Sequence, residues 1–429
     1  MKILNWSELS LVEQAVALQR PNVESMDVSA DVAKIIATVK QNGDAGIIAF
    51  TKQFDGVQAE KLLVSADEID AAWQELANDI KAALRRAYYN IEKFHRVQIP
   101  LDTEVEIEPG LVCKRLVRPL DSVGIYVPGG SAPLFSSLLM AAIPAKLAKV
   151  RQIILTSPPA KNGKVAPIIL AAAKICGVKE VYCVGGAQAI AAMAFGTKTI
   201  PKVNKIFGPG NDWVNGAKMQ VAQMSGGPAI DLPAGPSEVM VLADGSANSA
   251  WVAADLLSQA EHDPQSQVVL LALNMKVINE VKSDLQAQLK TLSRQEVANA
   301  SLKNSRLIVV NSYEQMLDIC NRYAPEHLII NTANADELVK GVQNAGSIFV
   351  GANTPEALGD YASGTNHVLP TNGAARSYSG LGVESFMKFI TVQKASKDAL
   401  SSIAPTLQKM AHLEGLDAHA KAISVRLET

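Results

Sequence analysis

Short apolar runs that alternate with helical segments dominate the chain from Asp121 onward. Runs of this length are typical of buried strands, and regular strand–helix alternation predicts parallel sheets covered by helices on both faces. The first set of predicted strands comprises SVGIYVP from Ser122, RQIILTS from Arg151, EVYCVGG from Glu180 and KIFGPG from Lys205. The second set comprises SEVMVLAD from Ser237, SQVVLLAL from Ser266, RLIVV from Arg306, HLIIN from His327 and GSIFVG from Gly346.

The two ends of the chain carry a helical pattern instead. An amphipathic period runs from Asp67 to Arg96 and predicts one long helix, and the chain after Gly382 again looks helical. We therefore expect an α/β protein with an N-terminal helical segment, two parallel-sheet units and a helical tail. The predicted division is an N-terminal segment 1–24, a first α/β domain built from 25–120 and 236–380, a second α/β domain 121–235 and a tail 381–429.

Composition excludes several classes of partner. The 429 residues are 48% hydrophobic with a formal net charge of −2, and no stretch concentrates Lys and Arg, which argues against a nucleic-acid partner or an anionic membrane surface. The long uncharged stretch from Ser122 to Ala145 holds three prolines and reads as a buried βα unit, not a membrane helix. Four scattered cysteines and an N-terminus without a secretory pattern favour a cytoplasmic protein.

Glycine-rich turns follow three of the predicted strands, at 127–130, 184–188 and 207–211. In open parallel sheets, ligands bind at the carboxyl ends of strands, and anions favour helix N-termini. None of the three turns matches GxGxxG, so they are either ordinary βα turns or a dinucleotide site without the usual fingerprint.

Two of the six histidines stand beside other groups that could do chemistry. Gln259 and His262 are three apart at the end of a predicted helix that stops before Pro264, so they share one face and could bind a borderline metal; a plain helix-terminal histidine is the alternative. Glu326 and His327 enter an apolar strand after Pro325 and are either two general bases or a surface pair.

Further polar residues lie in a loop and in the tail. Asp360 sits in the loop GDYASGTNH, where it is either a functional group or the residue of an Asx turn. Glu414 and His419 flank Gly415 and Asp417, which can end one helix and cap the next. Such a kink could direct both side chains the same way.

These segments together resemble the histidinol dehydrogenase family. The motifs that carry the resemblance are GIYVPGGSAPLFSS, VGGAQAIAA, KIFGPGN, DLPAGPSEV, LLSQAEH, PEHLII and GDYASGTNHVLPT. The resemblance covers nearly the whole chain, is densest from Pro119 to Pro370 and is thinner in the first hundred residues. It implies incomplete Rossmann-like domains, which agrees with the missing GxGxxG, and an intertwined homodimer.

The resemblance also assigns roles to residues that match the family's pattern. It implies one Zn²⁺ per subunit held by Gln259, His262, Asp360 and His419, and acid–base roles for Glu326 and His327. It implies NAD contacts at Tyr126, Gln188 and Asn211. Substrate contacts would fall on Ser237, Gln259, His262, His327, Asp360, Glu414 and His419. We expect His419 to reach the zinc of the other subunit, because the helical tail is detached and kinked.

The implied reaction is the oxidation of L-histidinol through bound L-histidinaldehyde to L-histidine with two NAD, the last step of histidine biosynthesis. Three alternatives stay open at this point. The chain could be a relative that oxidises another amino alcohol or polyol, a zinc hydrolase with Glu326 as its base, or a metal-binding protein without enzyme activity.

Overall fold

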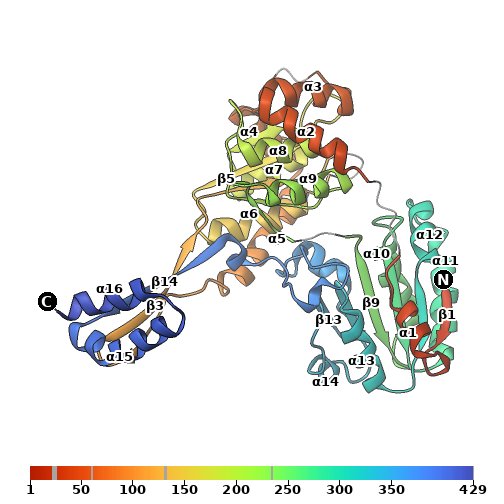
Figure 1. Ribbon diagram of the computed structural model, residues 1–429. Coiled ribbons are helices and arrows are strands. Elements are labelled where there is room, and N and C mark those ends of the chain that lie inside the picture. Colours follow the sequence, from red (N-terminus) through yellow and green to blue (C-terminus); the bar gives the residue numbers. More distant parts are fainter. Residues whose placement is uncertain (22–26, 59–60, 130–132, 233–234, 429) are drawn as a thin grey trace.

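The computed structural model describes residues 1–21, 27–58, 61–129, 133–232 and 235–428. Gly130 of the first glycine-rich turn and residues 233–234 of the DLPAGPSEV motif lie outside the described residues. Figure 1 shows two α/β bodies and an arm near the C-terminus that projects away from both.

One body is built on a sheet of six parallel strands in the order β1-β11-β10-β9-β12-β13. Along β9, alternate residues face opposite sides, with Val239 and Val241 in one apolar layer and Met240 and Leu242 in the other. Both faces are therefore covered, which explains the continuous apolar runs of the sequence. Its strands are β1 (Lys2–Asn5), β9 (Glu238–Ala243), β10 (Gln267–Ala272), β11 (Arg306–Val309), β12 (His327–Asn331) and β13 (Ser347–Val350). Its helices are α1 (Leu11–Ala17), α10 (Ser249–Ala260), α11 (Met275–Leu289), α12 (Gln295–Lys303), α13 (Tyr313–Tyr323) and α14 (Ala335–Val339).

The other body holds five parallel strands in the order β6-β5-β4-β7-β8. Val123 and Ile125 of β4 face one buried layer, whereas Tyr126 and Ile154 belong to the opposite one. Its strands are β4 (Ser122–Tyr126), β5 (Gln152–Ser157), β6 (Glu180–Cys183), β7 (Lys205–Phe207) and β8 (Ala229–Ile230). Helices α6 (Phe135–Leu147), α7 (Pro167–Cys176), α8 (Gly186–Phe195) and α9 (Asp212–Gln223) connect them. The two parallel sheets and all nine predicted strands are confirmed.

The helices of the first hundred residues pack on this five-stranded body. Helix α2 contacts α8, α4 contacts α7 and α5 contacts α6. Helix α5 also contacts the turn Leu358–Ala362 of the other body, where Asn90 donates to the backbone oxygen of Ala362 at 2.7 Å. The predicted division into domains, with 25–120 grouped with 236–380, stays a prediction. The helices are α2 (Ser29–Asn42), α3 (Asp44–Asp55), α4 (Ala66–Gln74) and α5 (Asn78–Arg96).

Local structure departs from the expected helices at both ends of the chain. In the tail, which was expected to be helical after Gly382, residues 387–395 form a strand. The predicted long helix from Asp67 is two helices, because Ala77 adopts an extended backbone that separates α4 from α5. The N-terminal segment, expected to be helical, begins with strand β1, which pairs with β11 at the edge of the larger sheet.

The arm contains an antiparallel sheet that the sequence pattern did not predict. Strand β3 (Leu111–Pro119) pairs with β2 (Thr103–Glu108) on one side and β14 (Met387–Ala395) on the other. Most of these residues are exposed and the others are only partly buried, so they lack the continuous apolar runs of the two larger sheets. Helices α15 (Lys397–Leu413) and α16 (Asp417–Leu427) follow, and Gly415 between them has a φ of +73°, as expected of a residue that ends a helix.

Candidate active site

The carboxylate of Glu326 and the imidazole of His327 lie at the start of β12, which runs between β9 and β13 in the larger sheet. His327 is the first residue of β12 and pairs with Val239 of β9 and Ser347 of β13. Both side chains are buried, each residue being 5% exposed. The Oε2 atom of Glu326 accepts a hydrogen bond from the backbone N–H of Glu238 at 2.9 Å. The surface-pair alternative for these two residues is therefore wrong.

Three carboxylates surround the imidazole of His327. Its Nδ1 lies 3.5 Å from Glu326 Oε2 and 3.8 Å from Glu356 Oε1, and its Nε2 lies 3.9 Å from Asp360 Oδ1. Burial lowers the pKa of His327, but the carboxylates of Glu326, Glu356 and Asp360 outweigh burial and raise that pKa to about 10. The imidazole is thus held as a cation unless another positive charge enters the site.

Glu356 is a member of this cluster that the sequence analysis missed. Burial raises its pKa to about 8, partly opposed by His327. It is 1% exposed, and its Oε2 is buried without a hydrogen-bond partner among the described residues. The sequence did carry a signal, because Glu356 stands four residues before Asp360 and can reach the same side of a helical turn.

Four oxygen and nitrogen donors converge beside this pair and fit a divalent metal. One ligand atom each from His262, Glu356 and Asp360 lies within 4.8 Å of the other two. Gln259 Oε1 is buried and has no hydrogen-bond partner in the described part of the chain, which is costly unless a cation binds it. Oxygen and imidazole donors without a thiolate suit zinc and related borderline ions.

Two local structures bring these donors together. Helix α10 ends at Ala260, so Gln259 lies in its last turn and His262 stands just beyond it, not on the helix as expected. Asp360 lies in a π-helical turn, Leu358–Ala362, a conformation that often occurs at functional sites. Its backbone oxygen contacts His367 Nδ1 at 2.8 Å, and His367 Nε2 contacts Ser137 Oγ of α6 at 3.2 Å.

All these side chains line one cavity of about 190 Å³ between the two α/β bodies. Ser237, which was predicted to contact substrate, lies on the same wall. The opposite wall includes Ser137, Gly208 and Lys218 from the smaller sheet's body. Lys218 and Asp231 form a buried ion pair. Lys218 donates a hydrogen bond to the backbone oxygen of Gly208 at 2.8 Å, and Asp231 accepts one from the backbone N–H of Gly208 at 2.8 Å. The ion pair therefore fixes the loop before Asn211.

The three residues predicted to contact a nucleotide line a different cavity of about 490 Å³, at the carboxyl ends of the strands of the smaller sheet. Tyr126 ends β4, and its hydroxyl accepts a hydrogen bond from the backbone N–H of Gly186 at 3.3 Å. Gln188 lies in the first turn of α8, and Asn211 caps α9 by accepting from Val214.

This second cavity suits a dinucleotide. Its walls add aromatic surface from Phe54 and Trp213 and a carboxylate from Asp55, none of which the sequence analysis selected. Aromatic walls can hold a base, polar side chains can bind a ribose, and a helix N-terminus can bind a pyrophosphate. Gly208 is required by close approach, because a Cβ there would lie 2.0 Å from the backbone oxygen of Tyr126.

The two tail residues, Glu414 and His419, do not join the site within this chain. Both are exposed and line neither cavity. Glu414 follows α15, and His419 lies in the first turn of α16, on the arm that projects from the body in Figure 1.

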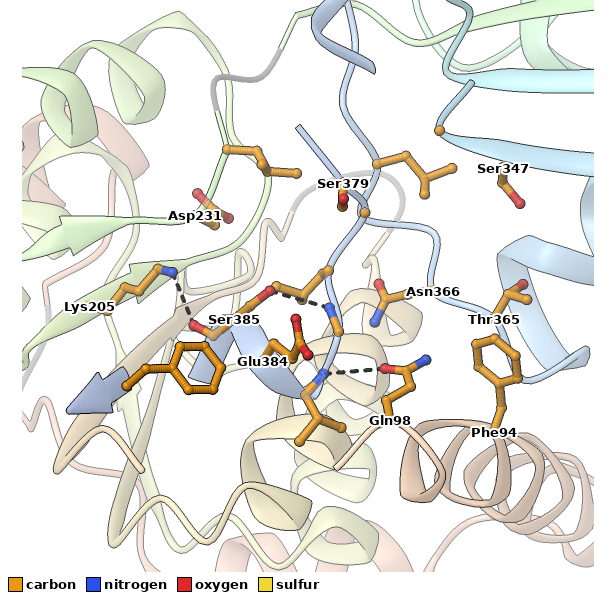
Figure 2. Close-up of a pocket in the computed structure, with 18 residues that line it drawn as sticks. Phe94, Gln98, Lys205, Asp231, Ser347, Thr365, Asn366, Ser379, Glu384 and Ser385 are labelled. Atoms are coloured by element: carbon orange, nitrogen blue, oxygen red, sulfur yellow. Dashed lines mark hydrogen bonds between the residues drawn. The ribbon is translucent and has the colours of Figure 1, made fainter. Parts of the chain in front are cut away.

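Figure 2 shows a larger cavity, of about 800 Å³, next to the candidate site. Asp231, Leu232 and Leu369 line both cavities. Near the root of the arm, Lys205 Nζ donates to the backbone oxygen of Ser385 at 3.0 Å. An open space of this size beside the site leaves room for a polypeptide segment.

No helix among the described residues is long and apolar enough to cross a membrane. This finding agrees with the interpretation of Ser122–Ala145 as a βα unit, since that segment forms β4 and α6.

A cavity suited to a dinucleotide, together with a buried carboxylate–imidazole pair in a neighbouring cavity, is typical of a dehydrogenase. Comparisons with known proteins specify the family. The family model for histidinol dehydrogenase matches residues 18–427. Histidinol dehydrogenase from Aliivibrio fischeri is 51% identical over 429 residues, covering 100% of this chain and 97% of the relative. That from Vibrio parahaemolyticus is 50% identical, covering 100% and 99%.

A solved structure agrees. The crystal structure of histidinol dehydrogenase from Elizabethkingia anophelis superposes with a TM-score of 0.96 at 45% identity, covering 100% of this chain and 97% of that one. This chain belongs to the histidinol dehydrogenase family and is an NAD-dependent oxidoreductase. The zinc hydrolase and the metal-binding protein without enzyme activity are therefore excluded as alternatives.

The cysteines offer no activated nucleophile near the site. Burial raises the pKa of Cys183 to about 11 and those of Cys176 and Cys320 to about 12, so these thiols stay protonated at neutral pH. Cys113 lies on β3 in the arm.

We predict that Cys113→Ser and Cys183→Ala, combined, leave turnover within about tenfold of wild type. Steady-state NADH formation measures this, and a folded double variant without activity would point to a covalent thiohemiacetal.

Proposed function

We propose that this chain oxidises L-histidinol through bound L-histidinaldehyde to L-histidine with two NAD, as the cytoplasmic last step of histidine biosynthesis. The observation that carries the proposal is the single cavity that unites Glu326 and His327 with Gln259, His262 and Asp360. Relatives at about 50% identity over their full length bear the same enzyme's name, which supports histidinol over another amino alcohol or polyol.

Gln259, His262 and Asp360, with His419 of the partner subunit, would hold one Zn²⁺ per subunit. The ion would bind the imidazole and amino nitrogens of histidinol and so fix its hydroxymethyl carbon. A dication beside Glu326, Glu356 and Asp360 would also lower the pKa of His327, which these carboxylates raise. The neutral imidazole is the form that can accept a proton. Ser237 lies on the same wall and can bind the substrate's polar groups.

In the first oxidation, His327 takes the proton of the alcohol while a hydride leaves the same carbon for NAD. In the second, Glu326 takes a proton from water as the oxygen adds to the aldehyde carbon, and His327 returns its proton to the former aldehyde oxygen, which completes the hydrate. His327, neutral again, then accepts a hydroxyl proton of this hydrate as the second hydride leaves. The backbone N–H of Glu238 keeps the carboxylate of Glu326 in place for this step. Tyr126, Gln188 and Asn211 would hold the nucleotide so that it reaches the cavity between the two bodies.

Glu414 and His419 would serve the site of a second subunit in a homodimer. Apolar residues are exposed on the same part of the arm, with Met410 at 56%, Leu413 at 75% and Leu416 at 41% exposure, which is typical of a surface that another chain covers. The cavity of Figure 2 gives such a segment a route to the site wall. Glu414 would accept a charge-assisted hydrogen bond from an imidazole N–H of the substrate.

Removing the metal tests the proposed function most simply. The purified protein should form NADH from histidinol faster than from other amino alcohols, and chelation should abolish this activity. Cobalt or manganese should restore part of it, since no thiolate demands a soft ion. His262→Asn should lose most of its bound zinc and its turnover, whereas Asp263→Asn, an exposed neighbour outside the cavity, should keep both. Full activity in a verified metal-free preparation would contradict the zinc assignment, and no NADH from histidinol would contradict the substrate.

The division of labour between Glu326 and His327 predicts different defects. Glu326→Gln should complete the first hydride transfer and then stall at the aldehyde, because its amide cannot take a proton from water. His327→Asn should slow both oxidations. Single-turnover kinetics with histidinol and with histidinaldehyde resolves the two steps. Equal slowing of both steps by Glu326→Gln would show that the division is wrong.

Mixed dimers test whether the tail serves the partner's site. His262→Asn and His419→Asn should each be inactive alone. When they are unfolded and refolded together in equal amounts, about half of the dimers should be mixed, and each mixed dimer should have one intact site, so activity returns to roughly a quarter of wild type. Mass spectrometry of the mixture serves as the control for subunit exchange. Mixed dimers without activity would place His419 in the site of its own chain.

A further inference from the structure

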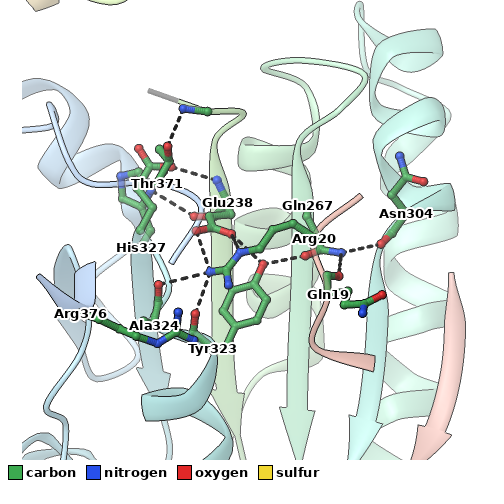
Figure 3. Close-up of polar contacts among 12 residues, drawn as sticks. Gln19, Arg20, Glu238, Gln267, Asn304, Tyr323, Ala324, His327, Thr371 and Arg376 are labelled. Carbon is green, nitrogen blue, oxygen red and sulfur yellow. Dashed lines mark hydrogen bonds and ion pairs between the residues drawn. The ribbon is translucent and has the colours of Figure 1, made fainter. Parts of the chain in front are cut away.

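Arg20 anchors the N-terminal segment to the strand that supports the catalytic pair. It follows α1, and its side chain is 17% exposed. Its Nε and Nη2 donate to the two carboxylate oxygens of Glu238, at 2.8 and 3.0 Å, and its guanidinium carbon lies 3.8 Å from the centre of the Tyr323 ring (Figure 3). Such a paired, stacked contact needs the planar fork of arginine and cannot be made by lysine.

The same guanidinium holds the turn that leads into Glu326. Nη2 of Arg20 also donates to the backbone oxygens of Tyr323 and Ala324, at 2.7 and 3.3 Å. Ala324 has a φ of +55°, a left-handed conformation that costs a non-glycine residue free energy. Its carbonyl contact with Arg20 helps to stabilise this turn two residues ahead of Glu326.

Glu238 connects Arg20 to both reacting side chains. Its backbone N–H binds Glu326, and its backbone oxygen lies 3.4 Å from Nδ1 of His327. Its carboxylate also accepts a hydrogen bond from the hydroxyl of Tyr323 at 2.8 Å. Glu238 is 1% exposed, so its charge depends on these buried partners.

We propose that Arg20 is a positioning residue that fixes the side chains of Glu326 and His327 through Glu238 and through the turn at Ala324. Arg20 does not line the cavity of the catalytic pair, but lies on the far side of Ser237 and Glu238, in a separate cavity of about 590 Å³. The proposal rests on the proposed function, because it takes Glu326 and His327 as the acid–base pair. It makes the first twenty residues part of the reaction machinery.

The test compares Arg20→Met, Arg20→Lys and Glu238→Gln with wild type. Each should lower kcat by about ten- to hundredfold, since small displacements of reacting groups have effects of this size, with KM for histidinol and NAD within about threefold. Zinc content should be unchanged. Arg306→Met is the matched control, because Arg306 binds the backbone oxygens of Asn304 and Ser305 in the same sheet without touching Glu238, and its kcat should stay at the wild-type value.

A double-variant cycle separates positioning from a general loss of stability. If Arg20 acts by holding Glu326, adding Arg20→Met to Glu326→Gln should slow aldehyde oxidation much less than it slows wild type. Multiplied defects in the double variant, or wild-type kcat in folded Arg20→Met, would overturn the proposal. Where Arg20→Met fails to fold, Arg20→Lys combined with Glu326→Gln gives the same two outcomes. A wild-type enzyme that does not oxidise histidinol would instead overturn the proposed function.

Discussion

Buried negative charge that the surrounding residues do not balance is the constraint on which this site depends. Glu326, Glu356 and Asp360 crowd around one imidazole, and the nearby ammonium of Lys218 is already paired with Asp231. Asp255, one turn before Gln259 on α10, adds to the excess, and burial raises its pKa to about 7. Carboxylates are taken out of water at high cost unless a cation or protons compensate them. A divalent metal bound by Gln259, His262 and Asp360, as proposed, would relieve this charge at the place where the substrate would have to be oriented.

The two sheets present opposite ends to the cleft between them. In the smaller sheet, the candidate nucleotide contacts follow the carboxyl ends of β4, β6 and β7, as in other open parallel sheets. In the larger sheet, Ser237 and His327 stand at the amino ends of β9 and β12. The end of α10 reaches the same edge, because a helix that follows a parallel strand runs back toward the strand's start. Under the proposed function, this opposition would bring the nucleotide and the hydroxymethyl carbon of the substrate toward one another from two separate bodies.

The sequence was sufficient to predict most strands of both parallel sheets, since their apolar runs reflect burial on two faces. It did not reveal β2, β3 and β14, whose residues are exposed or only partly buried, or the pairing of β1 with β11 far along the chain. The selected polar residues around His327 do lie together, but Glu356 was missed because its spacing from Asp360 does not by itself show that the side chain is buried. Arg20 was missed for a related reason, since its partners Glu238 and Tyr323 are about 220 and 300 residues away.

Anomalous diffraction at the zinc edge, from crystals of the zinc-loaded dimer, tests the central claim most directly. We expect one peak per subunit, within bonding distance of Gln259 Oε1, of a ring nitrogen of His262 and of a carboxylate oxygen of Asp360, with an imidazole of His419 of the partner subunit completing the set. A peak elsewhere in the molecule, or none in this cavity at full zinc occupancy, would contradict it.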